Sequence, residues 1–455
     1  MSERIIGSSN GERLSAAQID ANFADIHPLL SEAQAMAESA RCLYCYDAPC
    51  TKVCPTSIDV PKFIHQIRTQ NLKGSAATIL TANIMGGTCA RVCPTEILCE
   101  GGCVLNETGE KPVNIGELQR YAVDHFLKAE SPSPFTRAAG TGRKIAVVGG
   151  GPAGLSCAHR SAMYGHDVTV FESRPKPGGL NEYGLAAYKM TDDFAQKEVN
   201  FLMSIGGISV EYGRDLGKNL KLAELRSRFD AIFISVGLRS VNTLGIQGED
   251  MPGVESAVGF IERIRQAPVI HNLKVEDSVV VIGGGNTAID AAVQASRLGA
   301  RSVTLVYRRG ADQMPATAWE QDLVRVNDVR VIYWAKPISL IGNERVSGIR
   351  FERTALKDGK LIGKGEEFEL QADLILTAIG QVLDEESLAG LSIEKGKVRV
   401  QGNLHTGLPG VFAGGDCIDS GEDLTVQAVE DGSRAADSIN DYLAEKPKEV
   451  EEEHG

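Results

Sequence analysis

Lys144-Ile-Ala-Val-Val-Gly149-Gly-Gly151-Pro-Ala-Gly154 decides the fold of the middle of the chain. An apolar run that ends in glycines is typical of a buried strand, a tight turn and the start of a helix. A second apolar run, residues 167–172, follows one helix length later. The pattern predicts a strand–helix–strand unit whose helix start can bind a pyrophosphate through its backbone amides.

The three glycines of this fingerprint have separate roles. Gly149 permits the tight turn, Gly151 lets a pyrophosphate approach the backbone, and Gly154 packs the helix on the strand. Glu172 ends the second strand, where a carboxylate can accept hydrogen bonds from ribose hydroxyls. A packing turn without a ligand is the alternative, and it does not explain why strand, helix and acid are in register.

Two further glycine pairs favour FAD as the dinucleotide. Gly178-Gly179 precedes Leu180, and Gly414-Gly415 precedes Asp416 near the end of the chain. In two-dinucleotide flavoproteins a pair in the first place lets the chain cross the flavin, and the late aspartate binds the ribityl or pyrophosphate region. The predicted FAD residues are Gly149, Gly151, Ala153, Gly154, Glu172, Gly179, Leu180, Leu216, Gly415, Asp416, Thr425 and Val426.

A second unit of the same kind begins at residues 278–283. Gly283-x-Gly285-x-x-Ala288 again joins an apolar run to a helical pattern, and the next strand ends in Tyr307, followed by Arg308 and Arg309. Arginines at this place can pair with a 2′-phosphate, so the sequence favours NADPH, with NADH as the alternative. The alternative without a ligand is that both arginines are solvated surface charges. The predicted residues are Gly283, Gly284, Gly285, Asn286, Thr287, Arg308, Arg309, Ala378, Ile379 and Gly380.

Cysteines dominate the N-terminal region. Eight of the ten lie between residues 42 and 103, in the pattern Cys42-x2-Cys45-x4-Cys50-x3-Cys54-Pro, Cys89-x3-Cys93-Pro and Cys99-x3-Cys103. Clustered thiols and Cys-Pro pairs indicate iron–sulfur ligands, and structural zinc sites are the alternative. Cys157 is expected to pack in the core, and Cys417 is assigned no role.

Composition limits the remaining possibilities. The net charge of −13 disfavours nucleic acid and anionic membranes as partners, and 43% hydrophobic residues with 49 glycines fit a globular α/β protein. The N-terminus shows no apolar signal segment and no run is long enough to span a membrane, so we expect a cytoplasmic protein.

The fold class predicted from these patterns is an α-helical N-terminal iron–sulfur domain followed by an α/β two-dinucleotide-binding flavoprotein, with one of its two Rossmann-like domains inserted in the other. We expect residues 1–130 to be helical after an extended arm over 1–30, with helices over 61–70, 75–83 and 115–126. The FAD-binding domain takes residues 143–240 and 383–445, and the NAD(P)H-binding domain takes residues 241–382 between them. Residues 446–455 form an acidic tail that we expect to be disordered.

The cysteine motifs resemble one family closely. Arg41-Cys42 to Cys54-Pro55, Cys89-x-Arg91-Val-Cys93-Pro94-Thr95 and Leu98-Cys99-x-Gly-Gly-Cys103 look like the electron-input module shared by dihydropyrimidine dehydrogenases and the small subunit of glutamate synthase. The resemblance covers about residues 31–444. It implies that NAD(P)H reduces FAD, that electrons leave singly through two [4Fe–4S] clusters, and that no acid–base catalyst is needed on this chain.

The resemblance also implies a division of the ligands. In the dihydropyrimidine branch one cluster is similar to a set of Cys42, Cys45, Cys50 and Cys103, and the other to Cys54, Cys93, Cys99 and Gln119, with Cys89 as a spare thiol. Whether Gln119 or Cys89 completes the second cluster stays open. Lys189 matches a basic position near the flavin in the family, and a surface lysine is the alternative.

The partner subunit that the resemblance implies depends on which branch of the family the chain resembles more. Gln119 and Asp47-Ala48-Pro49-Cys50 favour the dihydropyrimidine branch, whereas Tyr307-Arg308-Arg309-Gly310 and Met314-Pro315 look more like glutamate synthase. The first branch implies a heterotetramer with an FMN- and iron–sulfur-containing subunit that reduces uracil or thymine. The alternatives are a glutamate synthase small subunit, or a similar electron donor, and a non-catalytic assembly subunit whose clusters are structural.

Overall fold

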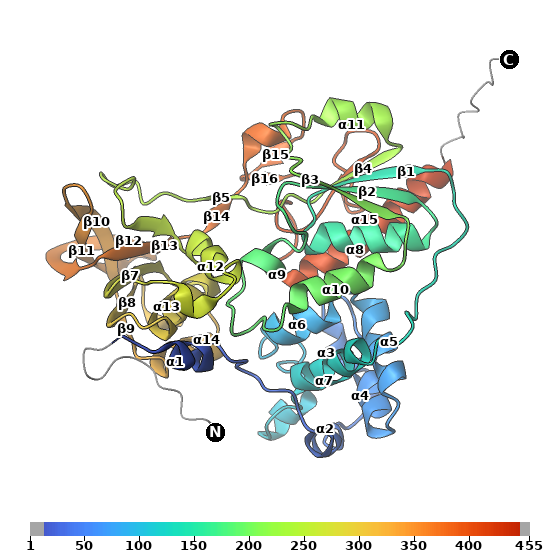
Figure 1. Cartoon of the computed structure of the whole chain (residues 1–455), viewed down its shortest axis with the longest axis horizontal. Helices are drawn as coiled ribbons and strands as arrows, with labels where there is room; N and C mark the ends of the chain where they lie inside the picture. Colours follow the sequence, from blue (N-terminus) through green and yellow to red (C-terminus); the bar gives the residue numbers. More distant parts are fainter. Residues whose placement is uncertain (1–12, 446–455) are drawn as a thin grey trace. The chain divides into compact units, whose positions relative to one another are not determined.

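The computed structural model describes residues 13–445, which divide into two compact units (Figure 1). The small unit contains residues 13–26, 183–192 and 240–382, and the large unit contains residues 27–182, 193–239 and 383–445. The predicted acidic tail lies outside the described residues. The helical cysteine region and the first strand–helix–strand unit thus share one compact body.

The cysteine region of the large unit is made of short helices around an apolar core. The helices expected around residues 61–70, 75–83 and 115–126 are present, with slightly different ends. Phe63, Ile64, Ile79 and Leu118 are fully buried between them. The elements are α2 (Glu32–Ser39), α3 (Pro49–Lys52), α4 (Val60–Arg68), α5 (Leu72–Ala82), α6 (Gly86–Val92), η1 (Val104–Thr108) and α7 (Ile115–Lys128).

A parallel sheet is the centre of the other part of the large unit. Its five strands, in spatial order, are β17 (Val411–Ala413), β4 (Ala231–Ile234), β1 (Lys144–Val148), β2 (Asp167–Glu172) and β3 (Ile208–Tyr212). β17 pairs with β4, so the last part of the chain completes a sheet that the middle part begins. The accompanying helices are α8 (Pro152–Met163), α9 (Leu180–Tyr183), α10 (Phe194–Met203), α11 (Leu222–Arg228) and α15 (Thr425–Glu445).

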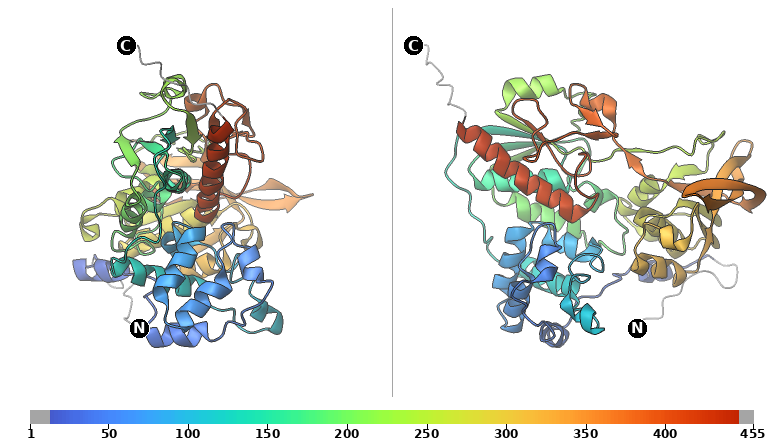
Figure 2. Two further views of the ribbon diagram at one scale, coloured as in Figure 1. Left: turned by 90° about the vertical axis from the view of Figure 1, so that its right-hand side faces the viewer. Right: turned by 180° about the vertical axis from the view of Figure 1, so that it is seen from behind.

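Helices α8 and α15 approach each other closely. A Cβ on Gly432 of α15 would lie 2.1 Å from the carbonyl oxygen of Ala153 in α8, so only glycine fits this crossing. Figure 2 shows α15 as one unbroken red helix beside the sheet of this unit. The contact holds the C-terminal helix against the start of α8, where the first fingerprint ends.

The small unit repeats the parallel arrangement. Its sheet has the order β6 (Val254–Ser256), β13 (Leu374–Ala378), β7 (Ser278–Gly283), β8 (Ser302–Tyr307) and β9 (Val329–Tyr333). An antiparallel sheet of β10 (Ala335–Gly342), β11 (Val346–Lys357) and β12 (Lys360–Gln371) follows β9 in the chain. The helices are α12 (Ala257–Arg265), α13 (Asn286–Arg297) and α14 (Ala318–Arg325). Short antiparallel pairs join β5 (Ser240–Val241) to β14 (Gln381–Val382) here and β15 (Ile393–Glu394) to β16 (Lys397–Val398) in the large unit.

One expectation about the N-terminus was wrong. The predicted extended arm contains α1 (Ala16–Asn22), which Ser15 begins through a capping box with Gln18. Ile19 and Phe23 are buried in the core of the small unit. Two apolar side chains one turn apart are too few to show a period in the sequence, and tertiary packing stabilises the helix.

None of the described helices combines the length and the apolar composition that crossing a membrane requires.

Candidate functional site

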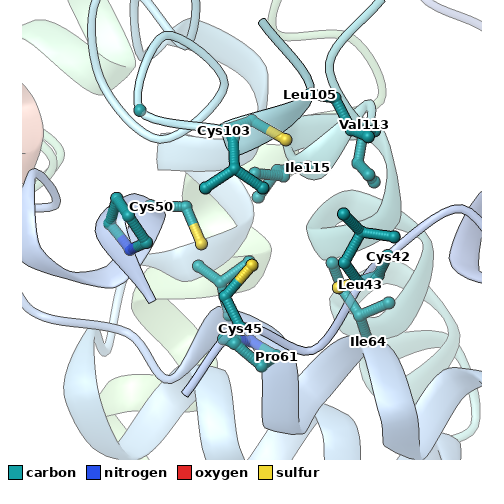
Figure 3. Close-up of a pocket in the computed structure, with 14 residues that line it drawn as sticks. Cys42, Leu43, Cys45, Cys50, Pro61, Ile64, Cys103, Leu105, Val113 and Ile115 are labelled. Carbon is teal, nitrogen blue, oxygen red and sulfur yellow. The ribbon is translucent and has the colours of Figure 1, made fainter. Parts of the chain in front are cut away.

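Four of the clustered cysteines line one pocket in the large unit. Cys42, Cys45, Cys50 and Cys103 surround it, with Leu43, Ile64, Val113 and other apolar side chains completing the wall. Figure 3 shows the sulfur atoms of Cys45, Cys50 and Cys103 directed into this space. The structure therefore brings together the four cysteines of the first ligand set that the resemblance implies.

The backbone around these thiols is shaped by tight turns. Tyr44 and Ala48 adopt positive φ angles of 53° and 37°, which curl the chain between Cys42 and the short helix α3 that carries Cys50. Burial, followed by the nearby Cys42 thiol, raises the pKa of Cys50 to about 11. The thiols are close enough to disfavour one another's ionisation, so a bound cation is what would stabilise four thiolates here.

The remaining cysteines form a second group. Cys89 and Cys93 are hydrogen-bonded to each other, and this contact with burial raises the pKa of Cys93 well above its usual range. The thiols of Cys54 and Cys99 add to the rise. Burial likewise raises the pKa of Cys99, with Glu100 and Cys54 as further causes. The three cysteines expected in the second set therefore lie near one another, and Cys89 lies beside them.

Gln119 projects from α7 toward α6. Its side chain is only 7% exposed, and Nε2 donates a hydrogen bond of 2.7 Å to the carbonyl oxygen of Gly86. A carbonyl can only accept, so this bond identifies which end of the amide is nitrogen and leaves Oε1 on the other side. A neutral oxygen held in a fixed direction is a suitable donor for iron.

The two metal alternatives need different spacings of the thiols. Tetrahedral zinc with Zn–S bonds of about 2.3 Å needs its sulfurs within about 4 Å of one another. In a polynuclear cluster each thiolate binds a different iron, and four thiols distributed around a pocket suit this arrangement.

The first fingerprint has the geometry of a dinucleotide site. Gly149 has φ +104°, and a Cβ on Gly154 would lie 1.9 Å from the carbonyl oxygen of Gly149. Gly151 is different, because a Cβ there would meet only Gly179, at 3.8 Å. The fingerprint is therefore tight where the helix packs on the strand and open where a pyrophosphate would approach.

The acid and the late glycine pair lie at the same helix start. Glu172 is buried and accepts hydrogen bonds of 2.8 Å from the backbone N–H groups of Gly150 and Arg174. A Cβ on Gly415 would lie 3.0 Å from the Cβ of Ala153, so the two signatures meet at the beginning of α8. Burial, with Asp423 nearby, raises the pKa of Asp416 to about 6.

The remaining residues predicted for FAD differ in burial. Leu216 and Val426 are buried, whereas Leu180 is exposed. Thr425 begins α15, and its hydroxyl donates to Oδ1 of Asn181 at 3.3 Å. This bond connects the start of α15 to the segment that follows Gly179.

The second fingerprint, in the small unit, is built in the same way. A Cβ on Gly283 would lie 2.2 Å from the carbonyl oxygen of Ala378, so the segment Ala378-Ile379-Gly380 passes directly beside the turn. A Cβ on Gly285 would meet nothing within 4 Å. Asn286 and Thr287 follow at the start of α13. Space for a phosphate thus opens over Gly285.

Arg308 and Arg309 follow the end of β8. Arg308 is exposed and Arg309 is half-buried. Their backbone carbonyls are bound by Thr354 Oγ1 and the Trp334 N–H, which fixes the turn. Within the described part of the chain neither guanidinium has a hydrogen bond or ion pair. Both cations therefore remain available to an anionic ligand.

Lys189 is not a surface lysine, so that alternative was wrong. It is 6% exposed in the small unit, and its Nζ lies 2.7 Å from Asp290 Oδ1 and 2.5 Å from Glu320 Oε1. Burial alone would lower the pKa of Lys189, but the two carboxylates outweigh it and the pKa is raised. A structural ion cluster accounts for these contacts, and the expected place beside the flavin stays a proposal.

Comparisons with known proteins agree with this geometry. Residues 143–432 match the family described as pyridine nucleotide-disulphide oxidoreductase, and residues 19–131 match dihydropyrimidine dehydrogenase domain II, 4Fe-4S cluster. The chain belongs to the pyridine nucleotide-disulphide oxidoreductase family. It is an NAD(P)H-dependent flavin oxidoreductase that also carries a 4Fe-4S domain.

Relatives from both branches are found. The chain is 34% identical to the NAD-dependent dihydropyrimidine dehydrogenase subunit PreT of Escherichia coli (strain K12), over 93% of this chain and 98% of PreT. It is 32% identical to the glutamate synthase [NADPH] small chain of the same organism, over 92% of this chain and 94% of that one.

Solved structures share the fold of the oxidoreductase part. Mycobacterium tuberculosis FprA in complex with NADPH has a TM-score of 0.58 and 21% identity, over 66% of this chain and 84% of that one. Lactococcus lactis thioredoxin reductase has a TM-score of 0.56 and 22% identity, over 67% of this chain and all of that one.

Two structural features of this oxidoreductase are not predicted by its sequence. Glu198 of α10 is buried against α6 and binds its backbone, and Tyr307 packs its ring on Gly284, 2.5 Å from the position a Cβ would take. A charged residue on an amphipathic helix gives no sequence signal for burial. The contact of Glu198 bridges 110 residues, so only the fold reveals it.

Proposed function

We propose that this chain is the electron-input subunit of a dihydropyrimidine dehydrogenase. It oxidises NAD(P)H at FAD and passes the electrons through two [4Fe–4S] clusters to an FMN-containing partner subunit that reduces uracil or thymine to 5,6-dihydropyrimidines. Gln119 carries the choice of branch: a neutral amide on α7, hydrogen-bonded to the first residue of α6, matches this branch, where the glutamate synthase branch typically has glutamate. The 34% identity to a dihydropyrimidine dehydrogenase subunit supports the same branch.

In this proposal each group of residues holds one cofactor. Gly149, Gly151, Glu172, Gly415 and Asp416 hold FAD through backbone amides and carboxylates. The fingerprint of α13 binds NAD(P)H. Bound FAD would convert a two-electron hydride into single electrons. The protein residues orient the two dinucleotides and give the clusters their charge and surroundings.

The metal ligands are proposed in two sets. Cys42, Cys45, Cys50 and Cys103 hold the first cluster, and their shared pocket supports this set. The second set is Cys54, Cys93, Cys99 and Gln119. Cys89 is buried beside Cys93 and is proposed as a spare thiol, so Cys89→Ser should retain both clusters whereas Cys99→Ser should lose one.

A second candidate function is the small subunit of glutamate synthase or a similar NADPH-dependent donor. The observation that favours it is the pair of guanidiniums at the end of β8, which suit a 2′-phosphate. The chain is also 31% identical to the glutamate synthase [NADPH] small chain of Halomonas elongata.

Anaerobic co-purification with the full chain as bait separates these functions. The recovered complex is assayed for NADH and NADPH oxidation with uracil, and separately with glutamine plus 2-oxoglutarate. Uracil-dependent oxidation with an FMN-containing partner supports the first function, and glutamate formation supports the second. A chain that reduces no artificial acceptor with either nucleotide contradicts both and leaves an assembly role.

A further inference from the structure

Glu198 is a buried carboxylate bound to the segment that carries Cys89 and Cys93. It is 2% exposed, and its Oε1 accepts hydrogen bonds from the N–H groups of Gly87 and Thr88 at 2.9 and 3.1 Å. Oε2 accepts from the Thr88 hydroxyl at 2.5 Å. A Cβ on Gly87 would lie 2.4 Å from the Phe194 ring and 3.0 Å from Glu198 Oε1, so glycine is needed for this approach.

One peptide group connects Glu198 to Gln119. The N–H of Gly87, which donates to Glu198, belongs to the same peptide as the C=O of Gly86, which accepts from Gln119 Nε2 at 2.7 Å. The chain of contacts therefore runs from the carboxylate through one peptide to the amide. Hydrogen bonds in series polarise one another. A negative charge on Glu198 therefore makes Oε1 of the Gln119 amide more electron-rich, and so a stronger electron-pair donor to iron.

The charges around Glu198 do not neutralise it. Across residues 13–445 it has no ion pair, and Arg91, the cation whose charge acts on it, is engaged by Asp124 at 2.7 Å and lies over the Phe194 ring. Arg120 also pairs with Asp124. Burial raises the pKa of Glu198 to about 7, which hydrogen bonds from Thr88 and Gly87 and the charge of Arg91 partly oppose. Burying a carboxylate is costly, and hydrophobic packing of α10 alone would not require one.

We infer that Glu198 is a positioning residue for the iron ligand Gln119, acting through the Gly86–Gly87 peptide to fix the amide and to lower the reduction potential of the second cluster. The inference rests on the proposed function, in which Gln119 binds that cluster. An ionised carboxylate opposes the addition of an electron nearby, and a more electron-rich ligand acts in the same direction.

Glu198→Gln in the full, cluster-loaded chain tests this directly, because the substitution keeps the shape and removes the charge. EPR-monitored redox titration at pH 8 should show the second cluster easier to reduce by about tenfold in its one-electron equilibrium constant, which is about 59 mV. The reduction potential of the first cluster, proposed to be held by the Cys42 set (Cys42, Cys45, Cys50 and Cys103), should not change. Glu182→Gln is the matched control, since Glu182 is equally buried in the same unit but binds Gln196 and Lys176.

A double-mutant comparison tests the route. In a Gln119→Cys background the effect of Glu198→Gln should shrink to less than half, because the amide that transmits it is gone. An undiminished effect there, or no shift in the single variant, overturns the inference while the ligand assignment stands. A Gln119→Cys variant whose cluster spectra match the wild type overturns the ligand assignment, and the inference with it.

If Glu198→Gln does not retain its clusters, the wild-type chain supplies the test. The potential of the second cluster should fall as pH rises through about 7, where Glu198 ionises, and the first should not follow it. A flat profile for the second cluster overturns the inference.

Discussion

Replacing Lys189 by methionine should destabilise the small unit strongly. Methionine fills nearly the same volume but leaves Asp290 and Glu320 without their shared cation. Tyr188, whose hydroxyl donates to Asp290 at 3.1 Å, cannot supply a charge. The change therefore isolates the loss of one buried positive charge from the loss of packing.

The size of the effect follows from the geometry. Both carboxylate oxygens lie within 2.7 Å of Nζ, so they lie at most about 5 Å apart once it is removed. Removing one partner of a buried ion pair typically costs about 3–5 kcal/mol. The folded protein should avoid two adjacent buried charges by keeping one carboxyl protonated at neutral pH, so the loss should be smaller at pH 5 than at pH 8.

Urea unfolding of the variant and the wild type at pH 5 and pH 8 measures this. Lys364→Met is the matched control, because Lys364 pairs with Glu366 at 3.4 Å in the same unit, both side chains are exposed, and an exposed pair contributes at most about 1 kcal/mol. Adding Asp290→Asn and Glu320→Gln to the Lys189 variant should restore much of the stability. Equal losses for the two lysine variants would refute the reasoning.

Three further predictions concern residues of the two dinucleotide sites. Gly154→Ala would place a Cβ 1.9 Å from the carbonyl oxygen of Gly149, so the purified variant should show no bound FAD in its visible spectrum. Gly285→Ala has open space around its Cβ, so this variant should keep FAD and raise only the KM for NAD(P)H. Arg308→Ser should reduce any preference for NADPH over NADH by about 10-fold or more, since a charged hydrogen bond contributes about 1.5–3 kcal/mol; an unchanged ratio in steady-state kinetics would exclude this arginine. The pKa of Asp416, about 6 in the folded protein, lies above its unfolded value of 3.8, so the folded state loses stability as pH rises between these values. Flavin-depleted Asp416→Asn should therefore be more stable than wild type at pH 8, by about 2–3 kcal/mol in urea unfolding, and the two should converge near pH 4.

The parts of the fold that the sequence predicts are those with local signals. The strand–turn–helix units at Gly149 and Gly283 were expected because the glycine spacing and the apolar runs lie within a few residues of each other, and the structure confirms the two Rossmann-like sheets. Helix α1 was missed because its stability comes from burying Ile19 and Phe23 in the small unit, which no local pattern records.

The charged residues of the interior could not be predicted in the same way. The contacts of Lys189 with Asp290 and Glu320 cross about 100 and 131 residues of sequence, and each side chain alone reads as solvated surface charge. Motif matching therefore locates the residues that touch a ligand, whereas a three-dimensional structure is needed to find buried charged residues whose partners lie far away in the sequence.

Gly86-Gly87 illustrates how such a contact constrains the sequence without forming a motif. The Gly86–Gly87 peptide must accept from Gln119 and donate to Glu198 at once, and a side chain at either glycine would collide, with Ile79 at 2.5 Å or with Phe194 at 2.4 Å. Gly87→Ala should therefore disturb Gln119 without touching any cysteine. We expect this variant to alter the EPR signal of the second cluster and to leave that of the Cys42 set unchanged, because the first pocket is lined by neither α6 nor Gln119. Equal changes in both signals would mean that Gly87 supports the helical region as a whole rather than one ligand.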